Sequence, residues 1–153
     1  MLLAALALTL FGMHGPEATV RRFTVKPWTI AVSTDKANGE IDCVIQGNHV
    51  AVFDDTLVVD FGRHTDTSRP FYRTSGQDAR LALANWPRNM PRSVIDGTPT
   101  ANPSDGIVTI PVAEVLASDR VYVMPAWGAR AAKFDLRGLA MARDAAVQAG
   151  CSS

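Results

Sequence analysis

The chain has 153 residues, of which 47% are hydrophobic and 20% are charged, so it holds enough apolar material for one core but is too short for two ordinary domains. Its 15 basic and 15 acidic side chains balance, which leaves no overall field to attract nucleic acid or an anionic membrane surface. We therefore expect a single domain and exclude a dedicated nucleic-acid binder.

The first feature along the chain is an apolar run from Leu2 to Phe11 that contains neither lysine nor arginine. Its length matches the hydrophobic part of an export signal and falls well short of the roughly 20 residues that span a bilayer. We expect residues 1–18 to be a signal peptide, residues 19–153 to form one β-rich domain, and no transmembrane span. The alternative is a frayed or buried N-terminal helix.

Alternating apolar and polar residues predict β-strands through the first half of the domain. These runs are 28–33, 41–46, 49–53 and 56–61. Strands this close together in sequence can pair only antiparallel with their neighbours. Residues 80–84 are interpreted as a further strand or one helical turn, and residues 85–105, with four prolines, as a long loop with one short strand near 93–95.

The last third of the chain continues the alternation and then changes to a helical period. Strands are predicted at 106–110, 119–124 and 131–136, and Pro111 is well placed to open a short helix near residues 111–118. From 137 to 149 small apolar residues recur every 3.6 positions, which predicts a C-terminal helix. The expected fold is therefore mainly β, an antiparallel β-sandwich or open barrel with the C-terminal helix packed across one sheet.

Cys43 and Cys151 are the two cysteines of the chain. In an oxidising compartment they supply one disulfide, which would close a loop of about 108 residues and tie the tail to the strand at 41–46. The alternative, in a cytosolic protein, is a pair of unpaired thiols. Neither cysteine belongs to a CxxC pattern or lies beside a histidine, so a redox or zinc motif has little support.

Several of these segments resemble one family. The run from Lys133 to Leu139, followed by an alanine-rich helix and a terminal cysteine, is similar to the end of small exported bacterial proteins of the invasion-associated locus B type. The run from Trp28 to Ile30, followed by Cys43 to Gln46, is similar to that family's opening. The resemblance implies a periplasmic or surface-exposed protein with a β-sandwich-like body, and it implies no catalytic residues.

The densest polar cluster is a candidate for chemistry. Asp60, His64 and Asp66 lie close together in the sequence, and carboxylates with an imidazole can bind a metal or perform acid-base catalysis. The alternative is a strand that ends at Phe61, followed by a solvated polar turn. The chain lacks a Gly-x-Ser-x-Gly elbow and both glycine-rich nucleotide-binding patterns. We expect no catalytic residues, no metal site and no cofactor.

Four residues are candidates for binding, because an aromatic ring in a turn beside an arginine can mark a contact surface. They are Trp86, Arg88, Trp127 and Arg130, whereas Trp28 opens an alternating strand and is expected in the core. The alternative for the two turn tryptophans is that they cap the end of the core. Residues 63–92 also carry six positive and two negative side chains, which are interpreted as solvated loop arginines rather than as a partner site.

These observations favour an exported protein, periplasmic or secreted, that acts by binding rather than by catalysis. The expected partner is a protein or another component of the cell envelope. The alternative is a small hydrolase or metal-dependent enzyme that uses Asp60, His64 and Asp66.

Overall fold

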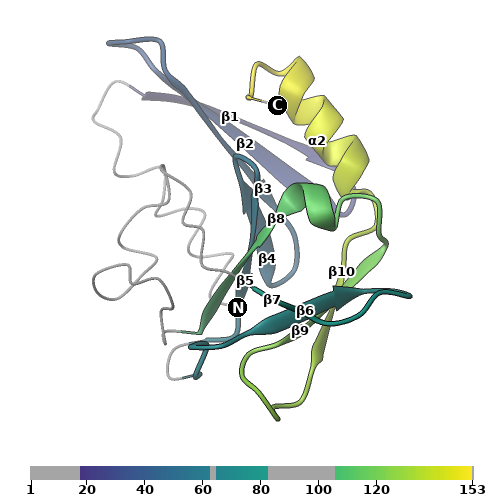
Figure 1. Ribbon diagram of the computed structural model, residues 1–153. Helices are drawn as coiled ribbons and strands as arrows, with labels where there is room; N and C mark the ends of the chain where they lie inside the picture. Colours follow the sequence, from purple (N-terminus) through teal and green to yellow (C-terminus); the bar gives the residue numbers. More distant parts are fainter. Residues whose placement is uncertain (1–17, 63–64, 83–105, 153) are drawn as a thin grey trace.

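A computed structural model describes residues 18–62, 65–82 and 106–152 of the chain. Two antiparallel sheets and one C-terminal helix make up this part (Figure 1). Their inward-facing side chains form one shared core, so the prediction of a mainly β sandwich is confirmed. Among the described strands, those at the borders of each sheet have a hydrogen-bonded neighbour on one side only, and neither sheet closes into a barrel.

The larger sheet has six strands, and four of the hairpin-connected strands occur where the alternation predicts them. Its spatial order is β1-β2-β3-β4-β5-β8. From β1 to β5 each strand pairs with the next strand in the chain, and β8 pairs with β5 at the edge of the sheet. The strands are β1 (Ala18–Val25), β2 (Trp28–Asp35), β3 (Ile41–Gln46), β4 (Val50–Phe53), β5 (Thr56–Asp60) and β8 (Ile107–Pro111).

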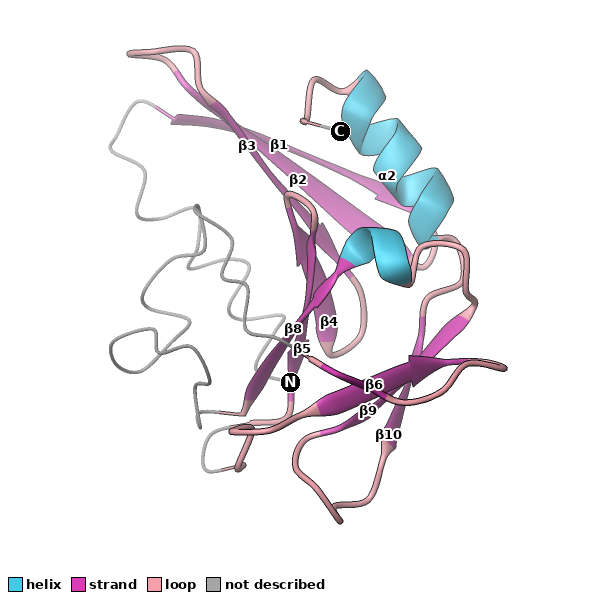
Figure 2. Cartoon of the chain, viewed as in Figure 1, coloured by secondary structure: helices cyan, strands magenta, loops and turns pink. Residues whose placement is uncertain are grey.

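The smaller sheet has four strands in the order β10-β9-β6-β7. It combines β6 (Phe71–Thr74) and β7 (Arg80–Leu81) with β9 (Arg120–Met124) and β10 (Ala132–Asp135). The central pairing joins β6 to β9, which are separated by more than forty residues of sequence. Figure 2 shows this sheet crossing below the larger one.

Two helical segments lie in the last third of the chain, one after β8 of the larger sheet and one after β10 of the smaller sheet. The predicted helix near 111–118 is shorter than expected: a 3-10 helix, η3, covers Val112–Glu114 and turns continue to residue 117. The predicted C-terminal helix is confirmed as α2, Leu139–Gln148, which begins two residues later than the period suggested. Gly138 precedes it with φ 80°, a left-handed conformation that favours glycine.

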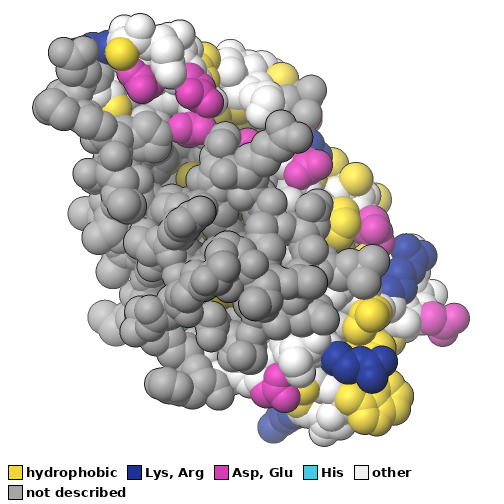
Figure 3. Space-filling model, turned by 60° about the vertical axis from the view of Figure 1, so that its left-hand side comes forward, with side chains coloured by type: hydrophobic (Ala, Val, Ile, Leu, Met, Phe, Trp, Pro, Cys, Tyr) yellow, Lys and Arg dark blue, Asp and Glu magenta, His cyan; other side chains and the backbone are white. Residues whose placement is uncertain are grey.

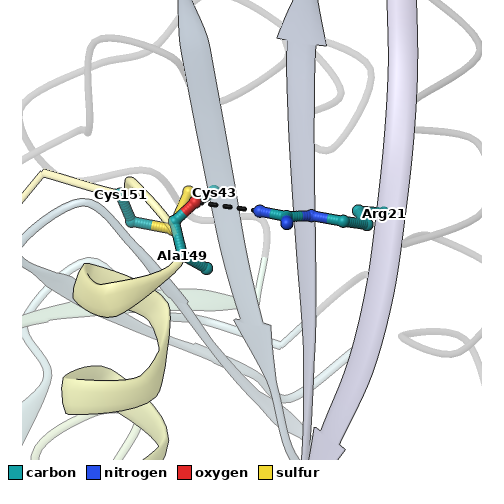
Figure 4. The surroundings of a disulfide bond; sticks show 4 residues. All are labelled: Arg21, Cys43, Ala149 and Cys151. Carbon is teal, nitrogen blue, oxygen red and sulfur yellow. Dashed lines mark hydrogen bonds between the residues drawn. A yellow bond between two sulfur atoms is a disulfide. The ribbon is translucent and has the colours of Figure 1, made fainter.

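Helix α2 packs across β1, β2 and β3 and is fastened at both ends. At its start, Trp28 in β2 is 1% exposed and its Nε1 donates a hydrogen bond of 2.9 Å to the carbonyl oxygen of Arg137. At its end, Cys151 forms a disulfide with Cys43 in β3, with Cα atoms 5.8 Å apart (Figure 4). The predicted disulfide and the predicted core position of Trp28 are both confirmed.

A third contact ties the end of the helix to the edge strand. The guanidinium of Arg21 in β1 donates a hydrogen bond of 3.0 Å to the carbonyl oxygen of Ala149, the residue that caps α2 (Figure 4). A cation suits this position because the carbonyl groups at a helix C-terminus carry partial negative charge. The tail is therefore held by a covalent bond and by a charged hydrogen bond.

Candidate functional site

Two of the four predicted binding residues lie in the loop that joins β9 to β10. Trp127 is 80% exposed, and its ring meets that of Phe71 in β6 at a centroid distance of 5.4 Å and an interplanar angle of 63°. Arg130, three residues further along, is also exposed. The alternative that Trp127 caps the core is therefore wrong. Trp86 and Arg88 lie outside the described residues.

Trp127 contacts Phe71, which lies on the outer face of the four-stranded sheet. The alternation of buried and exposed residues along the strands shows which side chains belong to this face. Tyr72 and Thr74 in β6 and Val121 and Val123 in β9 are buried, so the residues that alternate with them point outward. Phe71 lies opposite Met124 in the pairing of these strands. On the other side, Phe71 lies opposite Leu81 in β7.

A second row of outward-facing residues carries positive charge. Arg73 in β6 lies opposite Tyr122 in β9, which in turn lies opposite Lys133 in β10. The guanidinium carbon of Arg73 is 4.8 Å from the centroid of the Tyr122 ring, a cation–π contact. We call this surface the aromatic-basic face. It consists of Phe71, Arg73, Tyr122, Met124, Trp127 and Lys133.

The acidic side chain nearest to this face in the strand pairing, Asp135, is already paired with Arg137. Asp135 in β10 lies opposite Arg120, and its carboxylate accepts hydrogen bonds from the guanidinium of Arg137, with Nε at 3.0 Å from each oxygen. These bonds lower the pKa of Asp135 to about 2, so the carboxylate stays ionised and paired. Its charge therefore offsets Arg137, and no described residue forms an ion pair with Arg73 or Lys133.

Figure 3 shows yellow hydrophobic and dark blue basic side chains lying together toward the lower right of the molecule, with magenta acidic side chains beside them. Figure 1 places the four-stranded sheet at this lower end. The loop at residues 125–131 has the sequence Pro-Ala-Trp-Gly-Ala-Arg-Ala. Loops usually carry several hydrogen-bonding side chains, but here only Trp127 and Arg130 have one. Pro125 is buried, so the exposed part of the loop consists of Trp127, Gly128, Arg130 and Ala131, with Ala126 and Ala129 partly exposed. It offers one large aromatic ring beside a single positive charge.

The inner side of the same sheet carries a partly buried polar contact. The hydroxyl of Tyr72, a residue only 5% exposed, donates a short hydrogen bond to the carboxylate of Glu114 in η3, which also accepts a bond of 3.1 Å from Arg80. Burial raises the pKa of Tyr72 to about 12, and the hydrogen bond and negative charge of Glu114 add to the effect. The contact joins β6 to the segment that follows β8.

This contact predicts how stability changes at high pH. The unfolded chain loses the phenol proton near its ordinary pKa of about 10, before the folded protein does. The stabilisation is therefore complete below pH 10 and is lost as pH rises toward about 12. In the Tyr122→Phe variant, which keeps Tyr72 as its one tyrosine, absorbance at 295 nm should report ionisation near pH 12. In Tyr72→Phe, stability should fall less steeply between pH 10 and 12, and an unchanged slope would contradict the assignment.

The residues of the alternative enzyme hypothesis have local roles where the structure describes them. Asp60 accepts a hydrogen bond of 2.7 Å from the backbone N–H of Gly62, and Asp66 accepts one of 2.9 Å from that of Ser68. Hydrogen bonds from Ser68 also lower the pKa of Asp66. His64 lies outside the described residues. Within residues 18–62, 65–82 and 106–152, no three His, Cys, Asp or Glu side chains are grouped so that they could hold a metal ion.

A small hollow lies beside the disulfide, with Asp54 and Arg143 at its wall. Its free volume of about 20 Å³ is the space of a single water molecule, so it does not accommodate an organic ligand. Burial raises the pKa of Asp54, and the charges of Asp42 and Asp55 add to that effect. The hollow is thus a feature of the helix–sheet junction rather than a binding cavity.

Several residues of the aromatic-basic face were missed by the sequence reasoning. Arg73 was interpreted as a loop arginine, but it lies in a strand, as does Arg80. Phe71, Tyr122 and Lys133 were not singled out. The available signal was the alternation of exposed residues in β9 and β10, which indicates an outward-facing set.

Comparison of the chain with protein-family models, with curated proteins and with solved structures found no match. The case for a function therefore depends on the residues and on their geometry.

Proposed function

We propose that the chain is an exported envelope or periplasmic protein that acts by binding a partner through the aromatic-basic face and the loop at 125–131. The observation that carries the proposal is the indole of Trp127, which is 80% exposed and meets the ring of Phe71 in an edge-type contact. A large aromatic side chain left in water gains free energy when a partner covers it, and tryptophan and arginine dominate the energetics of many interfaces.

Three observations support export. The disulfide between Cys43 and Cys151 belongs to proteins that fold outside the reducing cytosol. The apolar run from Leu2 to Phe11 and the resemblance to exported proteins of the invasion-associated locus B type favour the same location.

A separate finding concerns helices that could cross a membrane. In the part of the chain that the structure describes, no helix is both long and apolar enough to do so.

Binding is favoured over catalysis by the roles of the acidic residues. The carboxylates of Asp60 and Asp66 are used by turn backbone in their own segments. No observation on the described residues favours the hydrolase or metal-enzyme alternative, whereas the exposed aromatic pair favours binding directly.

The proposal predicts that Trp127→Ala weakens binding to the envelope fraction of the host cell. We expect a loss of about tenfold in apparent affinity, since truncating a central aromatic side chain commonly costs more than 1 kcal/mol. Sedimentation of the purified protein with that fraction measures the effect. Met141→Ala is the matched control, because Met141 is 62% exposed but lies on α2, away from the loop. Equal binding by the wild type and by Trp127→Ala would defeat the proposed surface.

A further inference from the structure

We propose that the partner is the surface of an anionic phospholipid bilayer, with the loop at 125–131 inserted among the headgroups and the basic row of the aromatic-basic face lying over them. This inference rests on the proposed function and names the partner of the same surface. It is carried by the chemistry of the loop and by the row of charge beside it.

The loop has the composition of a segment that enters a membrane interface. Pro125 is buried at the start of the loop, and its exposed residues are Trp127, Gly128, Arg130 and Ala131, so the one charge beside the indole is positive. Tryptophan is favoured at the level of the headgroups because its ring is apolar and its N–H can still reach water or ester oxygens. Arg130 can keep its charge at the phosphates while its methylene groups lie against the apolar region.

The neighbouring strands supply an excess of positive charge, since the one acidic side chain on their outer face, Asp135, is paired with Arg137. Arg73 and Lys133 flank Tyr122 across β6, β9 and β10, and the carboxylate of Asp135 is held by Arg137. A positive row beside an exposed apolar loop complements a surface that carries phosphates above an apolar layer. Because the whole chain has no net charge, this local row orients the protein on the membrane.

A bilayer matches this surface better than a folded protein does. An interface with a protein is formed by a pocket for each aromatic anchor and by about one hydrogen bond per 100–200 Å². The loop at 125–131 supplies only the two hydrogen-bonding side chains of Trp127 and Arg130. The face adds Arg73, Tyr122 and Lys133, two of which are cations suited to phosphate groups. A lipid interface needs neither a preformed pocket nor a fixed hydrogen-bonding pattern, and apolar area with nearby positive charge is sufficient.

Co-sedimentation with vesicles tests the inference on the purified protein in its oxidised form. We expect binding to vesicles of phosphatidylglycerol and phosphatidylcholine to exceed binding to pure phosphatidylcholine by at least about tenfold. Binding should fall strongly at about 1 M salt, where the Debye length is about 3 Å. Brominated lipid should quench the tryptophan emission of the wild type. This quenching should disappear in Trp127→Phe, because a phenyl ring replaces the indole at that position.

Three variants separate the contributions. Arg73→Gln/Lys133→Gln should lower the partition coefficient by about fivefold for each charge removed, and Trp127→Ala should lower it by about tenfold. Met141→Ala should leave it unchanged. Because Trp127 is 80% exposed, its replacement leaves the core intact, and an unchanged thermal midpoint verifies this.

The outcomes distinguish this inference from the proposed function. If the protein binds neither vesicle but still binds the envelope fraction through Trp127, the lipid partner is wrong and the binding function stands. Loss of binding after proteolysis of the envelope fraction would likewise identify a protein partner and overturn the inference. If Trp127→Ala changes neither vesicle binding nor envelope binding, both proposals fail.

Discussion

Replacement of both cysteines by serine (C43S/C151S) should lower the free energy of unfolding by about 2–5 kcal/mol. The bridge joins residues 108 positions apart, so its removal frees a very long loop in the unfolded chain. It also releases the end of α2 from β3, leaving Arg21 and the packing of the helix to hold the tail. Urea denaturation of the wild type and the variant measures the change.

Reduction provides the control for this experiment. A dithiol reductant should bring the unfolding midpoint of the wild type close to that of C43S/C151S and should leave the variant unchanged. If the reduced wild type and C43S/C151S both unfolded at the same urea concentration as the oxidised wild type, the bridge would not stabilise the fold.

The second large effect is expected at the other end of the helix. Trp28→Ala should cost about 3–5 kcal/mol, because it removes the largest fully buried side chain of the core and leaves a cavity. The indole packs so closely on the backbone that a Cβ placed on Gly47 would lie 2.6 Å from its Cζ3 atom. The Arg137 carbonyl would also lose its donor from Nε1.

Trp28→Phe separates the packing from the hydrogen bond. It keeps an aromatic ring but has no donor for the Arg137 carbonyl, so we expect a smaller loss of about 1–2 kcal/mol. Hydrogen exchange should show that amides at the start of α2 lose protection in this variant. Equal stability of the wild type and Trp28→Ala would contradict the role assigned to the indole.

The sequence predicts those parts of the fold that depend on local patterns. Strands β2 to β5 and helix α2 follow from apolar periodicity, and the disulfide follows from the cysteine count and its context. Strand β1 was not predicted, because the adjacent Arg21 and Arg22 interrupt its alternation. At the edge of the sheet this pair is tolerated, and Arg21 serves the end of α2 instead of the core.

Strands β9 and β10 of the second sheet occur where the alternation predicts them, but the assembly of that sheet and its outer face could not be predicted in this way. Strand β6 has only four residues, and its main partner β9 lies far along the chain. Local periodicity therefore cannot predict that these two strands pair. The loop residues Trp127 and Arg130 were found because a tryptophan near a proline and an arginine is conspicuous in the sequence. Phe71, Arg73 and Lys133 become their neighbours only through the register of β6, β9 and β10.

Mass spectrometry of the protein isolated from its host, after alkylation of free thiols without reductant, tests the central claim of an exported, disulfide-closed binding protein most directly. We expect a mature chain that lacks residues 1–18, takes up no alkyl group without reductant, and takes up two after reduction. An uncleaved chain that is alkylated at both Cys43 and Cys151 without reductant would place the protein in a reducing compartment and contradict the account.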